Sequence, residues 1–295
     1  MSDGDLEVIV ADGGSTDGTA QVASNAGALV VANPERRTPN GLNRALQAAR
    51  GEVIVRFDAH AEMPPGYLAA CLRALEEEQG AANVGGWRDP RGTGPWGTAT
   101  SVALRSAFGV GNARIWRRPA QTERRRDVDT VPLGCFPAAV LREAGGWNEE
   151  YVRNQDFELN HRLRRAGGRV VFDPAIWSVY HPRESFRALV RQYWEYGLFK
   201  GKMVAEDPNS LRPRQAAPLI LLAMFVLAAT TGSLGRDARF GLAAYISLLA
   251  AVAVRGRGGW RTVPVMAAMH MMWGCGFAYE LLRRASTAAS LTRAG

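Results

Sequence analysis

The first two hundred residues alternate short apolar runs with runs whose apolar positions repeat at helical spacing. The apolar runs have the length of strands and end at turn residues. We expect strands at Leu6–Ala11, Ala28–Ala32, Glu52–Phe57 and Arg169–Phe172, and helices at Ala20–Ala26, Gly41–Ala49, Tyr67–Gln79 and Phe157–Ala166. This alternation predicts an α/β fold with a mostly parallel sheet covered on both faces.

The pattern changes after Arg214, where three uncharged runs follow one another. They are Gln215–Gly235 (21 residues), Phe240–Val254 (15) and Thr262–Tyr279 (18). The first and third approach the length of a bilayer span, whereas the second is short enough for a re-entrant element. A buried helical subdomain is the alternative, but the short separators leave it little polar surface. The sequence therefore predicts membrane attachment, and arginines beside every run leave the orientation open.

The segment between the two halves, Ser185–Val204, mixes aromatic and basic residues. Such a helix suits either the headgroup level of a membrane or packing between domains. The expected organisation is a catalytic domain at 1–184, a linker helix at 185–214, membrane-embedded helices at 215–284 and a tail at 285–295. The acidic, polar start at Met1–Asp5 does not have the pattern of a secretion signal, which favours a cytoplasmic catalytic domain on the cell inner membrane.

The amino-acid composition limits the classes of partner that the chain is expected to bind. The net charge of +8 suits nucleic acid, an anionic membrane or a phosphorylated substrate, but no nucleic-acid-binding motif is present, so nucleic acid is not expected. Cys71, Cys135 and Cys275 lack the spacing of metal ligands and are interpreted as buried or membrane-embedded small hydrophobic residues.

The segment Asp12–Thr19 joins the first expected strand to the first expected helix through a glycine-rich turn. Backbone N–H groups of such a turn can face a nucleotide, and Asp12 can accept hydrogen bonds from a base or ribose. A capped turn without a ligand is the alternative. The glycines Gly85, Gly86, Gly92, Gly94 and Gly97 predict a mobile loop or a series of turns.

Asp58 and His60 follow the strand at Glu52–Phe57 and are two residues apart, so both face one way on an extended chain. Together they can hold Mn²⁺ or Mg²⁺ against a diphosphate. The alternative is a turn with a solvated histidine. His181, after the strand-like Ala175–Tyr180, is either a third metal ligand or a histidine bonded within its turn.

Asp156 and Glu158 open the helix that follows Asn154. Acidic residues in a first turn suit the helix dipole, and Asn154 suits the N-cap, which is the structural interpretation. The functional interpretation is a general base that takes a proton from an acceptor hydroxyl.

In this order, the motifs resemble the inverting family 2 glycosyltransferases with the A-type fold, and in particular their succinoglycan-type, ExoA-like branch. The segments that carry the resemblance are Asp12–Thr19, Asn43–Asp58, Pro64–Tyr67, Phe108–Gly111, Gly145–Trp147, Asn154–Arg164 and Arg191–Tyr193. The resemblance covers residues 6 to 204, and the apolar segments that follow also fit.

The resemblance implies a Rossmann-like domain that transfers a hexose from a nucleotide-diphosphate sugar. Asp12 and Asn43 would bind the nucleotide sugar, and Asp58 would lie near the diphosphate. His60 stands where the family has the second Asp of an Asp-x-Asp motif, so the identity of the metal is open. Asp156 would be the base and Glu158 a supporting carboxylate.

At the acceptor side, where Gln192 and Trp194 are the expected contact residues, the segment Gln192–Tyr196 departs from the Gln-x-x-Arg-Trp motif of processive synthases. The resemblance therefore implies addition of a single sugar, to a polyprenyl-linked saccharide, in exopolysaccharide synthesis. The family also has a first strand ahead of the one at Leu6–Ala11, and only five residues precede Leu6, so we expect the sheet here to lack an inner strand. A non-catalytic remnant and a nucleotidyltransferase with a related sheet are the alternative functions.

Overall fold

The computed structural model describes residues 6–110 and 114–294, with side chains up to residue 287, so Gly111 of the Phe108–Gly111 motif lies outside the described residues. The chain forms two compact units. The first contains residues 1–87 and 118–178, and the second contains residues 88–117 and 179–295.

The first unit begins with a parallel strand pair. Strand β1 (Ile9–Asp12) pairs in register with β2 (Leu29–Ala32), and α1 (Thr19–Asn25) connects them. Helix α2 (Thr38–Ala48) follows and contacts both strands. These four elements lie where the alternation of apolar and amphipathic runs predicts them.

A six-stranded sheet follows, in the order β3-β7-β5-β8-β4, with β6 paired to β8. Its strands are β3 (Val53–Val55), β4 (Ala61–Glu62), β5 (Ala81–Pro90), β6 (Arg126–Asp127), β7 (Cys135–Pro137) and β8 (Arg169–Tyr180). Strand β7 runs antiparallel to both β3 and β5, and β6 antiparallel to β8. The sheet is therefore mixed, which corrects the mostly parallel sheet expected from the alternation.

The two sheets are separate in the described part of the chain. Strand β1 pairs only with β2, whereas β3 is the end strand of the larger sheet. The edges of the two sheets are not hydrogen-bonded to each other in residues 6–110 and 114–294. Leu6 and Val8, next to β1, are about half exposed there.

The glycines expected in a mobile loop lie partly in a buried strand. Gly85 and Gly86 belong to β5, and a side chain on Gly86 would overlap the backbone of Ile176 in β8. Glycine is required here for close approach of two strands rather than for mobility. A sequence pattern cannot separate these two uses of glycine, because they differ only in what lies opposite.

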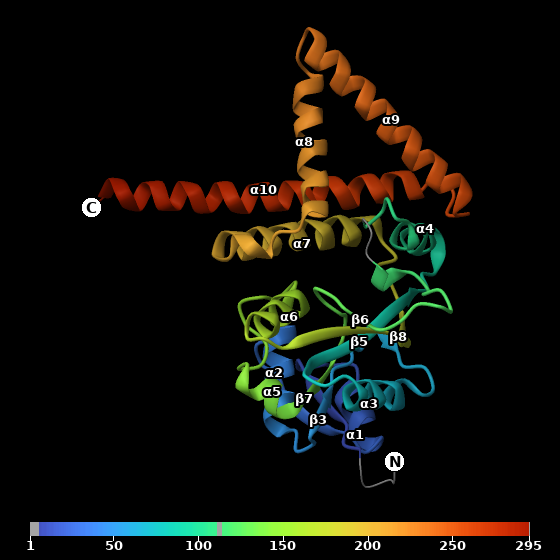
Figure 1. Ribbon diagram of the computed structural model, residues 1–295, viewed down its shortest axis with the longest axis vertical. Helices are drawn as coiled ribbons and strands as arrows, with labels where there is room; N and C mark the ends of the chain where they lie inside the picture. Colours follow the sequence, from blue (N-terminus) through green and yellow to red (C-terminus); the bar gives the residue numbers. More distant parts are fainter. Residues whose placement is uncertain (1–5, 111–113, 295) are drawn as a thin grey trace. The chain divides into compact units, whose positions relative to one another are not determined.

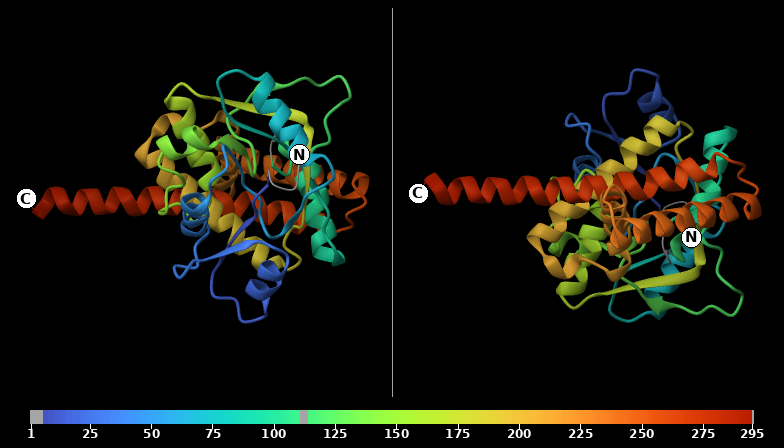
Figure 2. Two further views of the ribbon diagram at one scale, coloured as in Figure 1. Left: turned by 90° about the horizontal axis from the view of Figure 1, so that it is seen from below. Right: turned by 90° about the horizontal axis from the view of Figure 1, so that it is seen from above.

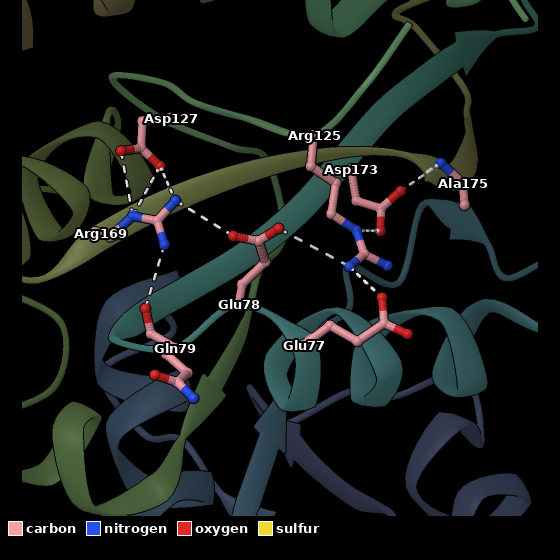
Figure 3. A network of polar contacts seen from close by, with 8 residues as sticks. All are labelled: Glu77, Glu78, Gln79, Arg125, Asp127, Arg169, Asp173 and Ala175. Atoms are coloured by element: carbon pink, nitrogen blue, oxygen red, sulfur yellow. Dashed lines mark hydrogen bonds and ion pairs between the residues drawn. The ribbon is translucent and has the colours of Figure 1, made fainter. Parts of the chain in front are cut away.

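Helix α3 (Tyr67–Glu77) covers the sheet near β7. Its inner face packs in a core that contains Cys71 and Cys135, as expected for buried small residues. Figure 3 shows how arginines tie the end of α3 to the sheet. Arg125 bridges Glu77 and Asp173, and Arg169 bridges Asp127 and Glu78.

The second unit is helical. It contains α4 (Gly94–Arg105), α7 (Phe186–Glu206), α8 (Ala217–Ala228), α9 (Ser233–Arg255) and α10 (Thr262–Ala294), with short 3-10 turns at Arg114–Trp116, Pro208–Ser210 and Pro213–Ala216. Its apolar core joins α4, α7, α9 and α10. Helix α10 is continuous in the views of Figure 2.

Helices α8 and α9 form a hairpin whose arms contact each other and α10 (Figure 1). By length and composition α9 can cross a membrane, and among the described residues it is the only such helix. Its most apolar window is only 17% buried, so core packing does not account for its apolar residues. Helix α8, with 12 residues, is shorter than a span.

The third apolar run, Thr262–Tyr279, has a different environment from the one expected. It forms the first half of α10, which packs along α7 and α4 and buries Val265, Met266 and Phe277. Its apolar character is therefore accounted for by protein contacts. Helix α7 likewise has a packed face, which includes Leu189 and Met203.

Glycines allow α7 and α10 to approach closely. A side chain at Gly197 would overlap the carbonyl of Trp273, and one at Gly276 would overlap the carbonyl of Trp194. Gly197→Ala is expected to lower the free energy of unfolding by about 1–3 kcal/mol, because neither backbone can yield without shifting a helix. Chemical denaturation measures this. Gly51→Ala is the control, since the nearest atoms to its new methyl group lie 3.5 Å away; equal losses in both variants would contradict the prediction.

Candidate active site

A buried arginine brings together two of the four carboxylates predicted as site residues from the sequence. Arg56 follows β3, is only 4% exposed and donates its backbone N–H to the carbonyl of Gly134 (3.0 Å). Its Nη2 donates to Oδ1 of Asp58 at 2.8 Å, and its Nη1 forms an ion pair with Oδ1 of Asp156. Asp58 and Asp156, 98 positions apart in the sequence, therefore flank one guanidinium.

Helix α6 (Gln155–Arg165) presents Asp156 in its first turn. Asn154 is at the N-cap, as expected, but in a left-handed conformation and without a side-chain cap hydrogen bond. A buried amide network fixes the helix to the sheet. Asn160 donates to Oγ1 of Thr130 (2.8 Å) and accepts from Asn83 (2.6 Å), whose own oxygen accepts from the backbone N–H of Cys135 (3.1 Å).

Glu158 stabilises the surroundings of the site through Arg162. It is buried and forms a two-pronged ion pair with Arg162, at 2.7 and 3.0 Å. Arg162 also donates to the carbonyls of Ala144 and Gly146. Glu158 thus holds the arginine that anchors the turn between α5 (Ala138–Glu143) and α6.

Asn43 binds the same turn from α2. Its Nδ2 donates to the carbonyl of Trp147 and its Oδ1 accepts the N–H of Trp147, both at 2.8 Å. Gly145 and Gly146 just before it have positive φ values of 76° and 68°, which glycine adopts without strain. The nucleotide-binding role of Asn43 stays a prediction, and in this structure its amide serves to join α2 to the turn.

Asp12 ends β1 and folds back on the glycine-rich turn. It accepts hydrogen bonds from the backbone N–H groups of Gly14 (2.9 Å) and Ser15 (3.1 Å) and from the hydroxyl of Ser15 (2.5 Å). The Ser15 hydroxyl is the main reason why the pKa of Asp12 is lowered. Asp12 therefore stays ionised and acts as an acceptor.

Two arginines of the candidate site were not predicted from the sequence. One is Arg56; the other is Arg36, whose guanidinium lies 3.4 Å from the position that a side chain on Gly14 would take. Arg36 places a positive charge beside the turn that follows Asp12. The signal was present as Glu35-Arg36-Arg37 after the second strand, but a charged loop by itself indicates only solvent exposure.

Asp58 and His60 lie in a turn, not on an extended chain as expected, because the N–H of Ala61 donates to the carbonyl of Asp58 (3.0 Å). His181 belongs to the second unit, where its Nδ1 lies 3.0 Å from the carbonyl of Arg91. Among the described residues no three His, Cys, Asp or Glu side chains gather to hold a metal ion. The metal-binding roles of Asp58, His60 and His181 stay predictions.

Gln192 and Trp194 lie on different faces of α7. Gln192 lines a small pocket in the second unit and donates to the hydroxyl of Tyr196 (2.7 Å). Trp194 packs against Tyr279 of α10 instead. The other residues that line the pocket are Thr100, Leu104, Trp116, Tyr180, Pro182, Leu189, Tyr193 and Tyr196. Four of these are aromatic, and the polar side-chain groups of the pocket are an amide and hydroxyls.

The part of the chain that carries Asp12, Arg56 and Asp58 matches a known family. Residues 2–145 match the model of "Glycosyl transferase family 2". The chain carries a family 2 glycosyltransferase domain. The glycosyltransferase is 29% identical to the succinoglycan biosynthesis protein ExoA of Rhizobium meliloti (strain 1021), over 93% of this chain and 86% of that protein.

Two further similarities concern an archaeal relative and a solved structure. The dolichyl N-acetyl-α-D-glucosaminyl phosphate 3-β-D-2,3-diacetamido-2,3-dideoxy-β-D-glucuronosyltransferase of Methanococcus voltae is 24% identical over 67% of this chain and 64% of its own length. A mannosyltransferase of Pyrobaculum calidifontis, solved with GDP-mannose and Mn²⁺, superposes with a TM-score of 0.56 at 23% identity, over 91% of this chain and 78% of that one. This superposition confirms the A-type fold expected from the resemblance.

Proposed function

We propose that this glycosyltransferase moves one sugar from a nucleotide-diphosphate sugar to a lipid-linked saccharide in glycan synthesis, with inversion at the anomeric carbon. The observation that carries the proposal is the arrangement at Arg56. It joins a carboxylate suited to the donor, Asp58, to one suited as a base, Asp156.

In the proposed reaction, Asp156 accepts the proton of an acceptor hydroxyl. The hydroxyl oxygen forms a bond to the anomeric carbon from the side opposite the diphosphate, and the bond from that carbon to the diphosphate oxygen breaks. The nucleoside diphosphate leaves with the bonding electrons. Asp12 contacts the nucleoside, and Arg36 beside it offers positive charge to the donor.

A divalent metal ion fits the donor side in its chemistry. Asp58 supplies a carboxylate and His60 an imidazole two residues later, a pair that suits Mn²⁺ or Mg²⁺ when a diphosphate and water complete the shell. When bound, such an ion neutralises charge that develops on the leaving group. The mannosyltransferase with the similar fold was solved with Mn²⁺, which supports the proposal. His181 remains a proposed third ligand.

The acceptor is proposed to reach the pocket beside Gln192. Aromatic faces with an amide and hydroxyls suit a saccharide, since they offer apolar contact and a few directed hydrogen bonds. The names of the two relatives refer to succinoglycan synthesis and to a sugar on dolichyl phosphate. Both support a saccharide acceptor, and the second supports a lipid carrier.

Membrane attachment is proposed through the α8–α9 hairpin. Its exposed apolar residues include Ile220, Phe225, Val226, Phe240, Ile246 and Val254. Arginines lie at its base, at 212, 214, 255 and 257, where they suit anionic headgroups. A hairpin enters and returns, so α7 and α10 lie on one side of the membrane. The inner membrane with a cytoplasmic catalytic domain is our proposed location.

The test is transfer by purified membranes supplied with a panel of nucleotide-diphosphate sugars and lipid-linked acceptors, with and without EDTA. We expect transfer with one donor, loss in EDTA and recovery with Mn²⁺ or Mg²⁺. Donor binding by calorimetry without transfer or hydrolysis would favour the non-catalytic alternative. Formation of a new nucleotide sugar from a nucleoside triphosphate would favour a nucleotidyltransferase.

A further inference from the structure

We propose that Arg56 is a positioning residue that fixes the base Asp156 relative to the donor-side carboxylate Asp58. The inference rests on the proposed function and adds a residue to its machinery. It comes from the geometry of one buried guanidinium, which holds two carboxylates from distant parts of the chain.

Arg56 is held rigidly enough for this task. Its side chain is 2% exposed, and its backbone N–H donates to Gly134 at the start of β7. The guanidinium is planar, with donors in a fixed fork, so two carboxylates bound to its two Nη atoms have a defined separation. Helix α6 carries Asp156 as a fixed element, because the amide network at Asn160 fastens it to the sheet.

The charges around Arg56 also support a positioning role. A buried arginine is stable only when its charge is compensated, and here both compensating groups belong to the proposed reaction. Without Arg56, the carboxylates of Asp58 and Asp156 would face each other across the space it leaves. They would then repel one another, and the base would turn away from the position in which it meets the acceptor hydroxyl. Small displacements of this kind cost about 10²-fold in rate.

The chain offers a matched control in Arg125. It also bridges two carboxylates of the first unit, Glu77 and Asp173, at 2.5 and 2.6 Å (Figure 3). None of these three residues belongs to the proposed machinery. Arg125→Met therefore reproduces the loss of an arginine between two acids without touching the reaction.

The experiment is a double-mutant cycle on the full chain in membranes, with activity measured per folded enzyme. Arg56→Met is expected to lower kcat by about 10²-fold and to change the Kd of the donor by less than about threefold. In the Asp156→Asn background, Arg56→Met should change the residual rate by less than about twofold, because it acts through the missing base. Arg125→Met should lower thermal stability and leave kcat unchanged.

If the Arg56→Met variant does not fold, the Arg56→Lys variant provides the test instead. The ammonium group of lysine keeps the positive charge but lacks the fixed pair of donors that a guanidinium offers to two carboxylates. We therefore expect kcat to fall by about tenfold with the donor Kd unchanged. Equal losses in the wild-type and Asp156→Asn backgrounds, or a loss confined to donor affinity, would overturn the proposal for Arg56 alone. A wild-type chain that transfers no sugar from any donor would overturn the proposed function, and this inference with it.

Discussion

Asp156→Asn is expected to lower kcat by about 10²–10⁴-fold, the range that a general base contributes. The amide keeps the size of the carboxylate but cannot take up the proton of the acceptor hydroxyl. The protein should remain folded, because Arg56 keeps its ion pair with Asp58. The Kd of the donor should stay close to that of the wild type, and single-turnover transfer together with calorimetry separates the two effects.

Asp127→Asn is the matched control for this prediction. Asp127 is also paired with an arginine, Arg169 at 2.8 Å, and lies in the same unit, in the polar network at the end of α3 (Figure 3). The activity of the Asp127→Asn variant should equal that of the wild type. If Asp156→Asn retains the wild-type rate, the base is another group and the proposed mechanism is wrong.

Introducing charge into the α8–α9 hairpin is expected to release the protein from membranes. Phe225 of α8 and Ile246 of α9 are apolar and exposed, so Phe225→Asp with Ile246→Asp leaves the core of the unit intact. Each aspartate within the hydrocarbon costs about 2.5–3.5 kcal/mol, so the pair should reduce membrane partitioning by about 10³-fold or more. Flotation on lipid vesicles measures the bound fraction.

Val22→Asp is the control, because Val22 is 69% exposed on α1 of the first unit and should not affect binding. High salt should leave the wild type bound if apolar insertion dominates over attraction between arginines and headgroups. Release of the wild type by salt alone, with no further effect of the aspartates, would contradict insertion of the hairpin.

Local patterns were enough to find the elements whose apolar residues repeat in a regular way. Strands β1 and β2 and helices α1, α2, α3 and α6 lie within a few residues of their predicted ranges. Strand β5 was missed because Asn83, Gly85 and Gly86 make it look like a loop. These residues suit it only because β8, Val131 and Asn160 lie opposite them.

The apolar tail illustrates the same limit on a larger scale. Hydropathy treats Phe240–Val254 and Thr262–Tyr279 alike, as runs without charge. In the structure the first remains largely exposed in α9, whereas the second packs along α7 through the glycines at 197 and 276. Close packing depends on two glycines 79 positions apart in the sequence, each facing the right backbone, which no local window can contain.

Local sequence patterns predicted the resemblance to family 2 glycosyltransferases and the order of the early strands and helices, and they proposed the carboxylates at 12, 58, 156 and 158 as site residues. These depend on residue type and short spacing, which a linear pattern records. The tertiary structure decided that the sheet is mixed, that Asn43 and Glu158 support one turn, and that Arg56 joins Asp58 to Asp156. Those features are contacts between residues distant in the chain, and their energy exists only once the folded backbone has brought them together.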